Sequence, residues 1–310
     1  MAERISDEEL TAMYIEELKK TYRAFVSFCE KHNFIFYACG GTMIGAVRHK
    51  GLIPWDDDID VLMSRSDYNQ FLALKSQMLG SGYEILDWRT KGYGLPFAKF
   101  CNANSTVIPK ENSQISYGVF IDVFPIDEVD GTIEEILKKC NNYRVWLHAY
   151  MACNSRLCLK TLFNRGPHNL SSSVGHIFAR VFLQPFKKCI ERRILKLERT
   201  IFHGDMLCSP FGAYKKGEVF EKSWFISHSK CKFEDSYIYL PNGYHEYLTN
   251  MFGNYMQLPP EDDRVSNHSL FYTNFKRRLT PEQVKSNYQE AKFDGFFSDR
   301  EGKKNAYDHE

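Results

Sequence analysis

Residues 40–61 read GGTMIGAVRHKGLIPWDDDIDV, where a glycine pair is followed by an acidic run and an apolar stretch. Four carboxylates fall within five positions of this run: Asp56, Asp57, Asp58 and Asp60. Like charges this close destabilise one another unless a cation compensates them. In an extended segment successive side chains alternate, so Asp56, Asp58 and Asp60 are expected on one face and Ile59 on the other. The run therefore predicts a site for a divalent cation.

Oxygen ligands of this kind favour Mg²⁺ or Mn²⁺ over zinc. The spacing differs from an EF-hand, which needs a glycine at the sixth loop position and a distal glutamate. The structural alternative is an acidic turn that caps a helix or faces solvent. The flanking Pro54-Trp55 pair and the apolar strand predicted over 59–63 favour the metal site.

The glycine pair Gly40-Gly41 lies between a short apolar strand predicted over 34–38 and a helix predicted from Thr42 to His49. Glycines at such a turn let backbone N–H groups approach a phosphate, and the start of a helix favours its negative charge. The spacing matches neither a Walker A loop nor a dinucleotide-binding fingerprint. Alone, the pair is usually only a turn, and its value lies in the carboxylates that follow it.

A third carboxylate occurs in FIDVFPID, residues 120–127, within a strand predicted over 118–124 and ended by Pro125. Asp122 alternates with Ile121 and Val123, and burying a carboxylate there is costly unless it meets a cation. We expect Asp122 to point into the cleft that Asp58 and Asp60 line. Asp127 better fits an aspartate that pairs with an arginine or caps a helix.

The rest of the chain predicts an α/β (α+β) fold, a mixed sheet with flanking helices. Helical periodicity covers 7–31, 67–79, 132–160, 173–200 and 243–252, and further strands are expected over 83–88, 97–101 and 233–239. We predict five parts: an N-terminal helix (1–31), a catalytic core (32–130), a helical insertion (131–205), a C-terminal segment (206–293) and a flexible tail (294–310).

The composition excludes several classes of protein. Lys and Arg total 40 against 39 Asp and Glu, a net charge of +1, which excludes a polybasic nucleic-acid binder. Hydrophobic residues make up 43% and aromatic residues 15%, which is typical of a globular protein and not of a disordered one.

Targeting features predict a cytoplasmic location. The acidic start, MAERISDEEL, lacks the basic flank and apolar run of a secretory signal. Nine cysteines are scattered without a CxxC pair, which favours reduced thiols. Residues 173–193 mix aromatic and basic side chains, which fits either peripheral contact with the inner face of a membrane or an ordinary amphipathic helix packed on the sheet.

Three blocks together carry a family resemblance: GGTMIGAVRHKGLIPWDDDID, FIDVFPID and YLPNGYHEYLTNMFGNYMQLPP (239–260). They resemble the LicD family, which has the nucleotidyltransferase fold and includes bacterial phosphocholine transferases and animal fukutin-related ribitol-phosphate transferases. The resemblance spans about 22–268. It implies transfer of a phospho-alcohol, most of all phosphocholine, from a CDP-linked donor such as CDP-choline to a sugar hydroxyl of a cell-surface glycan or teichoic acid precursor, with release of CMP.

The resemblance also implies roles for single residues. Asp58 and Asp60 match the metal ligands and Asp122 the third carboxylate, so these three are the expected catalytic residues. Asp56 matches the leading acid of the run and is a further candidate metal ligand. One departure is Phe252-Gly253-Asn254, where members of the family often carry an acid, and it suggests a different acceptor-side surface.

A mechanism follows from the charge of such a donor. Two cations about 3.5–4 Å apart can bridge the phosphates and stabilise the attacking and leaving oxygens. Asp122 would take the proton of the acceptor hydroxyl. Gly40, Gly41 and Thr42 would orient the donor phosphates through backbone N–H groups, with Arg48 and Lys99 as cationic partners. Alternatively, Arg48 only neutralises Asp56 or Asp57, and Lys99 points outward.

Other functions remain open from the sequence. A nucleotidyltransferase would use an NTP and release pyrophosphate, and a CDP-linked ethanolamine, glycerol, ribitol or aminoethylphosphonate donor would present the same diphosphate chemistry. A non-catalytic sugar-binding module is disfavoured, because the three expected catalytic aspartates are all present. A glycan or lipid-linked oligosaccharide is the expected acceptor, and no nucleic acid is expected as a partner.

Overall fold

The computed structural model describes residues 6–111, 113–154, 181–200, 203–264, 270–286 and 295–297. The chain divides into two compact units. Unit 1 comprises Met1–Ile85, Lys99–Val123 and Trp224–Glu310, and unit 2 comprises Leu86–Ala98 and Phe124–Ser223. The five parts predicted from the sequence stay a prediction; the helical insertion, 131–205, falls within unit 2.

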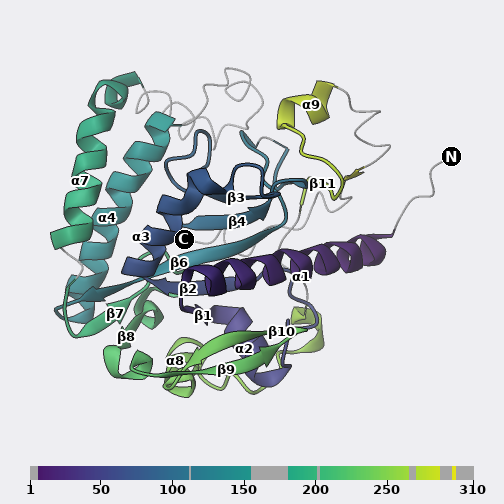
Figure 1. Cartoon of the computed structure of the whole chain (residues 1–310). Helices are drawn as coiled ribbons and strands as arrows, with labels where there is room; N and C mark the ends of the chain where they lie inside the picture. Colours follow the sequence, from purple (N-terminus) through teal and green to yellow (C-terminus); the bar gives the residue numbers. More distant parts are fainter. Residues whose placement is uncertain are drawn as a thin grey trace. The chain divides into compact units, whose positions relative to one another are not determined.

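A mixed sheet forms the centre of unit 1 (Figure 1) and confirms the predicted fold class. The strand order is β3-β4-β6-β2-β1-β10-β9. β1 runs parallel to β10, whereas β1 with β2 and β10 with β9 are antiparallel. The strands are β1 (Phe36–Ala38), β2 (Asp60–Ser64), β3 (Tyr83–Leu86), β4 (Ala98–Asn102), β6 (Phe120–Val129), β9 (His228–Phe233) and β10 (Ser236–Pro241).

Helix α1 (Asp7–His32) covers one face of this sheet and closely matches the helix predicted over 7–31. A capping box of Ser6 and Glu9 starts it, because each satisfies a backbone N–H of the other. Phe25 makes edge contacts with Phe36 and Phe100 at 5.1 and 5.6 Å between ring centroids. This aromatic layer fixes α1 against β1 and β4, the two strands that flank β2 and β6 in the sheet.

Helix α2 (Gly40–Arg48) begins two residues earlier than predicted, so the glycine pair is its first turn rather than a loop before it. Gly40 has φ of 49°, a left-handed conformation that glycine adopts at little cost. Strand β2 begins only at Asp60. Residues 56–59 precede the strand, and Asp56 N donates to Ile53 O at 2.9 Å. The expected alternation of Asp56, Asp58 and Asp60 stays a prediction, and the burial of Ile59 between the half-buried Asp58 and Asp60 agrees with it.

Strand β6 is longer than predicted and runs through Pro125 to Val129. Its first part lies beside β2 and β4, and its last part pairs with β7 from Asp127 onward. Pro125 lies inside this strand, two residues before the pairing with β7 begins at Asp127. Proline was therefore a wrong stop signal here.

The remaining elements of unit 1 surround this sheet. A second sheet has the order β12-β11-β5. Its strands are β5 (Thr106–Ile108), β11 (Tyr272–Asn274) and β12 (Phe296–Phe297), and the helices are α3 (Arg65–Ala73), η1 (Leu74–Met78), α8 (Tyr244–Phe252), η5 (Glu261–Asp263) and α9 (Pro281–Ser286). Helix η4 (Lys222–Phe225) crosses from unit 2 into unit 1.

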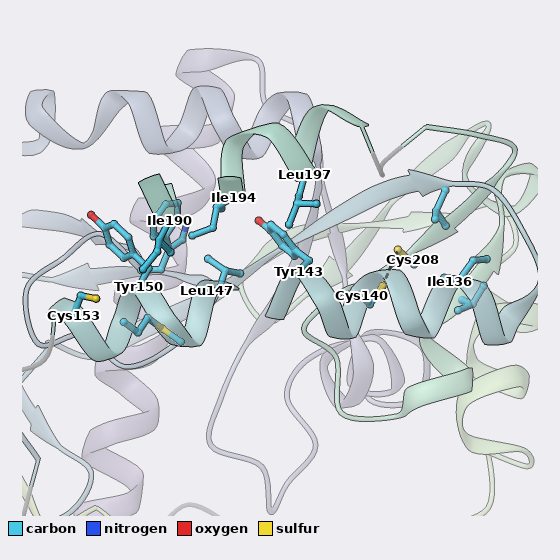
Figure 2. Packing of buried hydrophobic residues seen from close by; sticks show 14 residues of the cluster. Ile136, Cys140, Tyr143, Leu147, Tyr150, Cys153, Ile190, Ile194, Leu197 and Cys208 are labelled. Atoms are coloured by element: carbon cyan, nitrogen blue, oxygen red, sulfur yellow. Dashed lines mark hydrogen bonds between the residues drawn. The ribbon is translucent and has the colours of Figure 1, made fainter. Parts of the chain in front are cut away.

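Unit 2 is built on a pair of helices, α4 (Ile133–Asn154) and α7 (Lys187–Thr200), which lie side by side (Figure 1). Figure 2 shows Ile136, Tyr143 and Leu147 from α4 in one cluster with Ile190, Ile194 and Leu197 from α7. β6 continues here beside β7 (Met206–Cys208), which pairs with β8 (Val219–Glu221). The short helices are η2 (Gln184–Phe186) and η3 (Lys215–Glu218).

Parts of two predicted helices, and most of the predicted tail, lie outside the described residues. Of the two helices these are 155–160 and 173–180, and of the tail 294–310 only residues 295–297 are described. Among the described helices, none combines the length and apolarity that crossing a bilayer requires. No disulfide joins the eight cysteines that lie among the described residues.

Candidate active site

The acidic residues come together in unit 1, where β2 and β6 are neighbours. Asp122 N donates to Ile59 O at 2.9 Å, so Asp122 lies across from the residue between Asp58 and Asp60. Ile59 is fully buried, whereas Asp58 and Asp60 are half-buried. This placement agrees with the expectation that Asp122 lies close to Asp58 and Asp60.

Thr42 holds the backbone of Asp60. Its hydroxyl accepts a hydrogen bond from Asp60 N at 2.9 Å, and Cys39 N donates to Asp60 O at 3.1 Å. The Thr42 side chain is 2% exposed, so it lies inside the protein. Sequence reasoning considered only the N–H of Thr42 and missed this positioning role.

Gly41 lies against Asp56. A Cβ atom at Gly41 would come within 2.9 Å of Asp56 Oδ2, closer than such contacts normally allow. The carboxylate of Asp56 therefore lies at the first turn of α2, where the helix dipole favours negative charge. This contact joins the glycine pair to the acidic run, as the sequence predicted, but a carboxylate of the chain itself already lies at that turn.

The carboxylates share one electrostatic environment. The pKa of Asp60 is held well above its ordinary value, first by burial and then by the charges of Asp58, Asp122 and Asp56, while Lys99 opposes the shift. Such crowding favours binding of a cation. Among the described residues, however, no group of three or more His, Cys, Asp or Glu side chains is arranged to hold a metal ion.

The acidic residues fit a magnesium site of the open kind. Mg²⁺ is commonly bound by one or two carboxylates, several waters and the phosphates of the substrate rather than by a complete protein cage. Asp58 and Asp60, with Asp122 beside them, supply carboxylate oxygens of that type. The described residues do not form a complete set of four aspartate ligands around one metal position.

Lys99 lies beside Asp122 and not at the surface. Its Nζ atom donates to Asp122 Oδ1 at 2.5 Å, and the two side chains are only 3% and 11% exposed. The ammonium also lies 3.3 Å from the centroid of the Phe120 ring and 5.2 Å from that of Tyr117. This buried ion pair, with aromatic rings beside the ammonium, orients the Asp122 carboxylate and compensates part of its charge.

Two buried tyrosines feel the charge of these carboxylates, and neither was predicted as a site residue. Burial, helped by Asp57, Asp58 and Asp122, raises the pKa of Tyr14 well above its usual range. Burial and Asp122 raise the pKa of Tyr117 in the same direction. Both hydroxyls therefore keep their protons. Tyr14 comes from α1, and no pattern in the sequence links that helix to the acidic run.

Arg48 lies at the opposite end of α2. Its Nη1 atom donates to Tyr255 O at 3.0 Å, and its Nε atom donates to His49 Nε2 at 2.9 Å. Burial and the nearby charge of Arg264 lower its pKa. Among the described residues Arg48 forms no ion pair with the acidic run, so the structure does not support the alternative in which it neutralises Asp56 or Asp57.

Comparison with known proteins identifies the domain that contains these residues. The family model described as "LicD/FKTN/FKRP, nucleotidyltransferase domain" matches residues 33–151. The lipopolysaccharide cholinephosphotransferase LicD of Haemophilus influenzae is 29% identical over 254 residues, which cover 79% of this chain and 90% of that protein. An uncharacterized protein of Rickettsia typhi is 34% identical over 82 residues, 26% of this chain and 25% of its own length.

Proposed function

Because the chain belongs to the LicD family, we propose that it is a phosphotransferase that moves phosphocholine from CDP-choline to a sugar hydroxyl of a glycan and releases CMP. The observation that carries this proposal is the match to the Haemophilus influenzae cholinephosphotransferase, which covers 90% of that enzyme. The carboxylates brought together on β2 and β6 support it, because they lie within the matched domain.

In this proposal Asp58 and Asp60 hold Mg²⁺ or Mn²⁺, with Asp56 as a further ligand and Asp122 nearest the acceptor. A bound pair of such ions would offset the negative charge of the diphosphate and of the departing CMP. Thr42 fixes the backbone of Asp60 and Gly41 leaves space for Asp56, so both keep the carboxylates in place.

The acceptor hydroxyl loses its proton as it attacks the phosphorus atom. Asp122 is the proposed general base, because its backbone lies across from Ile59, and Ile59 is the residue between the expected metal ligands Asp58 and Asp60. Lys99 orients Asp122 through their 2.5 Å ion pair. In this proposal the backbone N–H groups of Gly40, Gly41 and Thr42 would orient the donor phosphates at the first turn of α2, where the Asp56 carboxylate also lies.

A lipid-linked acceptor would require contact with a membrane surface, and α7 offers a suitable face. Its buried stripe, Ile190, Ile194 and Leu197, packs against α4. The opposite side is basic and exposed: Lys188, Arg192, Arg193, Lys196 and Arg199. Just before the helix, Val181, Phe182 and Phe186 are each more than half exposed. Basic residues next to exposed aromatics favour an anionic membrane surface, so we propose peripheral contact through 181–199.

A second candidate is a nucleotidyltransferase that uses an NTP and releases pyrophosphate. It is favoured by one observation, the description of the matched domain as a nucleotidyltransferase domain. The two functions differ in the leaving group, which makes them simple to separate.

The test is incubation of the purified full chain with Mg²⁺ and a panel of CDP-choline, other CDP-alcohols and NTPs, with candidate glycan acceptors. We expect acceptor-dependent CMP release with CDP-choline. Folded Asp58→Asn and Asp60→Asn variants should lose at least about 100-fold in kcat, as for loss of a principal electrostatic group. Asp205→Asn, at an exposed aspartate of unit 2, is the matched control. Pyrophosphate release from an NTP would support the second candidate instead.

A further inference from the structure

Several side chains converge where α2 ends and the acidic run begins. Arg48 is held by main-chain carbonyls: Nη1 donates to Tyr255 O at 3.0 Å and, more weakly, to Gln257 O at 3.5 Å. Its Nε atom donates to His49 Nε2 at 2.9 Å. The guanidinium is thus fixed in one orientation by three acceptors.

Arg264 joins Arg48 from the segment that follows η5. Its Nε atom donates to Pro259 O at 3.0 Å, and its Cζ atom lies 5.6 Å from the centroid of the Trp55 ring. The Trp55 ring is in turn 6.4 Å from the His49 ring. We refer to Arg48, His49, Trp55 and Arg264 as the basic cluster.

The charge of the basic cluster is largely uncompensated by the protein. The two guanidiniums repel each other, since the nearby charge of Arg264 contributes to the lowered pKa of Arg48. In the part of the chain that the structure describes, Arg264 forms an ion pair with Glu261, whose carboxylate is 3.9 Å away and whose side chain is 90% exposed. Among the described residues neither arginine uses its Nη2 atom in a hydrogen bond. Two fixed guanidiniums with donors to spare have the geometry of an anion site.

We propose that the basic cluster binds a phosphate group of a substrate, a second anion subsite beside the acidic run. This inference rests on the proposed function and adds residues to it, since Arg264, His49 and Trp55 have no role in the mechanism above. Arginine forks match phosphate oxygens in pairs, and the Trp55 ring supports Arg264 from one side. Trp55 directly precedes Asp56 in the sequence, so the chain leads from the basic cluster into the acidic run.

The same chemistry has two sources. The phosphate can belong to the diphosphate of the donor or to a phosphate carried by the acceptor glycan. The choline group itself is excluded from the basic cluster, because its permanent positive charge would be repelled by both arginines.

The first experiment measures binding without catalysis. Inorganic pyrophosphate and inorganic phosphate are titrated into the full chain by calorimetry in the presence of a chelator, so that a metal-dependent site does not contribute. We expect pyrophosphate to bind and Arg264→Gln to raise its Kd at least tenfold. Arg264→Lys should raise it also, because lysine keeps the charge but loses the fork. Arg23→Gln, at an exposed arginine of α1, should have no effect.

The second experiment identifies the source from kinetics of the same variants. A tenfold rise in KM for CDP-choline with an unchanged KM for the glycan assigns the basic cluster to the donor, and the reverse pattern assigns it to the acceptor. The proposal is overturned if pyrophosphate binds folded Arg264→Gln and Arg264→Lys as it binds the wild type, or if Arg23→Gln weakens binding equally. Because calorimetry needs no turnover, failure of the proposed function leaves the binding test intact.

Discussion

At the scale of residues, the site consists of neighbouring carboxylates that a few specific contacts hold in place. Asp58, Asp60 and Asp122 could be chosen as candidate site residues from the sequence, because burying a carboxylate among apolar residues costs free energy unless a cation compensates its charge. The hydrogen bond that the Thr42 hydroxyl accepts from Asp60 N could not be predicted, and neither could the influence of the carboxylates on Tyr14. Both depend on residues that are far apart in the sequence and close in the fold, which no local sequence pattern encodes.

The ion pair of Lys99 and Asp122 gives the first prediction. Lys99→Met leaves a buried carboxylate without its partner, so the free energy of unfolding should fall by about 3–5 kcal/mol. The double variant Lys99→Met/Asp122→Leu should recover most of this loss and remain inactive. Urea denaturation measures the stability and CMP release measures the activity. A single variant as stable as the wild type would contradict a structural role for the pair.

Gly41 gives the second prediction. A methyl group at Gly41 would lie 2.9 Å from Asp56 Oδ2 and must displace the carboxylate. Gly41→Ala should therefore lower kcat by about tenfold, an estimate based on the cost of misplaced catalytic groups, while the protein stays folded. Gly94→Ala is the matched control, because a Cβ there meets nothing within 4 Å. Equal activity of both variants would argue against close placement of Asp56 and α2.

At the scale of elements, the sequence predicted which helices and strands exist better than where they begin and end. The glycine pair indicated a turn, yet it became the first turn of α2, because Gly40 can adopt φ of 49°. Pro125 indicated the end of β6, yet the strand continues and pairs with β7 from Asp127 onward. In the second case tertiary pairing overrides a local signal.

Helix η3 carries a buried acid that should make stability depend on pH. Burial raises the pKa of Glu218 to about 7 from 4.5, although Tyr214 N donates to its Oε1 at 3.3 Å. Between about pH 4.5 and 7 the folded state keeps a proton that the unfolded state has lost, so the free energy of unfolding falls as the pH rises. The full effect above pH 7 is at most about 3 kcal/mol.

Glu218→Gln should remove this slope and stabilise the protein at pH 8, because an amide needs no ionisation and still accepts from Tyr214 N. The measurement is urea denaturation of both proteins at pH 5 and pH 8. Glu221→Gln, at an exposed position of β8, is the control and should keep the wild-type slope. Parallel pH profiles for the wild type and Glu218→Gln would refute the assignment.

Helix α7 gives a prediction about membranes. Phe182→Ser/Phe186→Ser removes two aromatic side chains that are 56% and 58% exposed. Binding to vesicles that contain anionic lipid should weaken at least tenfold, because both apolar contacts with the interface are lost. Ile226→Ser, at a residue that is 80% exposed in unit 1, should bind like the wild type. Flotation of the protein with vesicles measures the effect, and equal flotation of all three proteins would exclude this face.

At the scale of the whole molecule, the near-zero net charge hides a separation of charge. The net value of +1 combines the acidic run with the basic cluster and the basic face of α7. The sequence allowed the first of these to be located, because its members are consecutive. Arg48 and Arg264 are more than two hundred positions apart, so only the fold brings them together.

The acidic run should make the stability of the protein respond to metal. Mg²⁺ that binds only the folded state raises the melting temperature according to its concentration relative to Kd. We expect an increase of a few degrees for the wild type at millimolar Mg²⁺ and for Asp205→Asn, and none for Asp58→Asn/Asp60→Asn. Thermal unfolding followed by circular dichroism provides the measurement. An equal increase in all three proteins would place the metal elsewhere.

Unit 1 is built from three separate segments of the chain, which limits the order in which its parts can fold during synthesis. β1 lies near the start of the chain, and its partner β10 spans Ser236–Pro241. During synthesis, therefore, α1, α2 and the acidic run leave the ribosome long before the strand that completes their sheet. The segments of unit 2 are finished by residue 223, so unit 2 can fold first. A ribosome that stops before residue 236 releases a chain that carries all its candidate site aspartates but lacks the strand that pairs with β1.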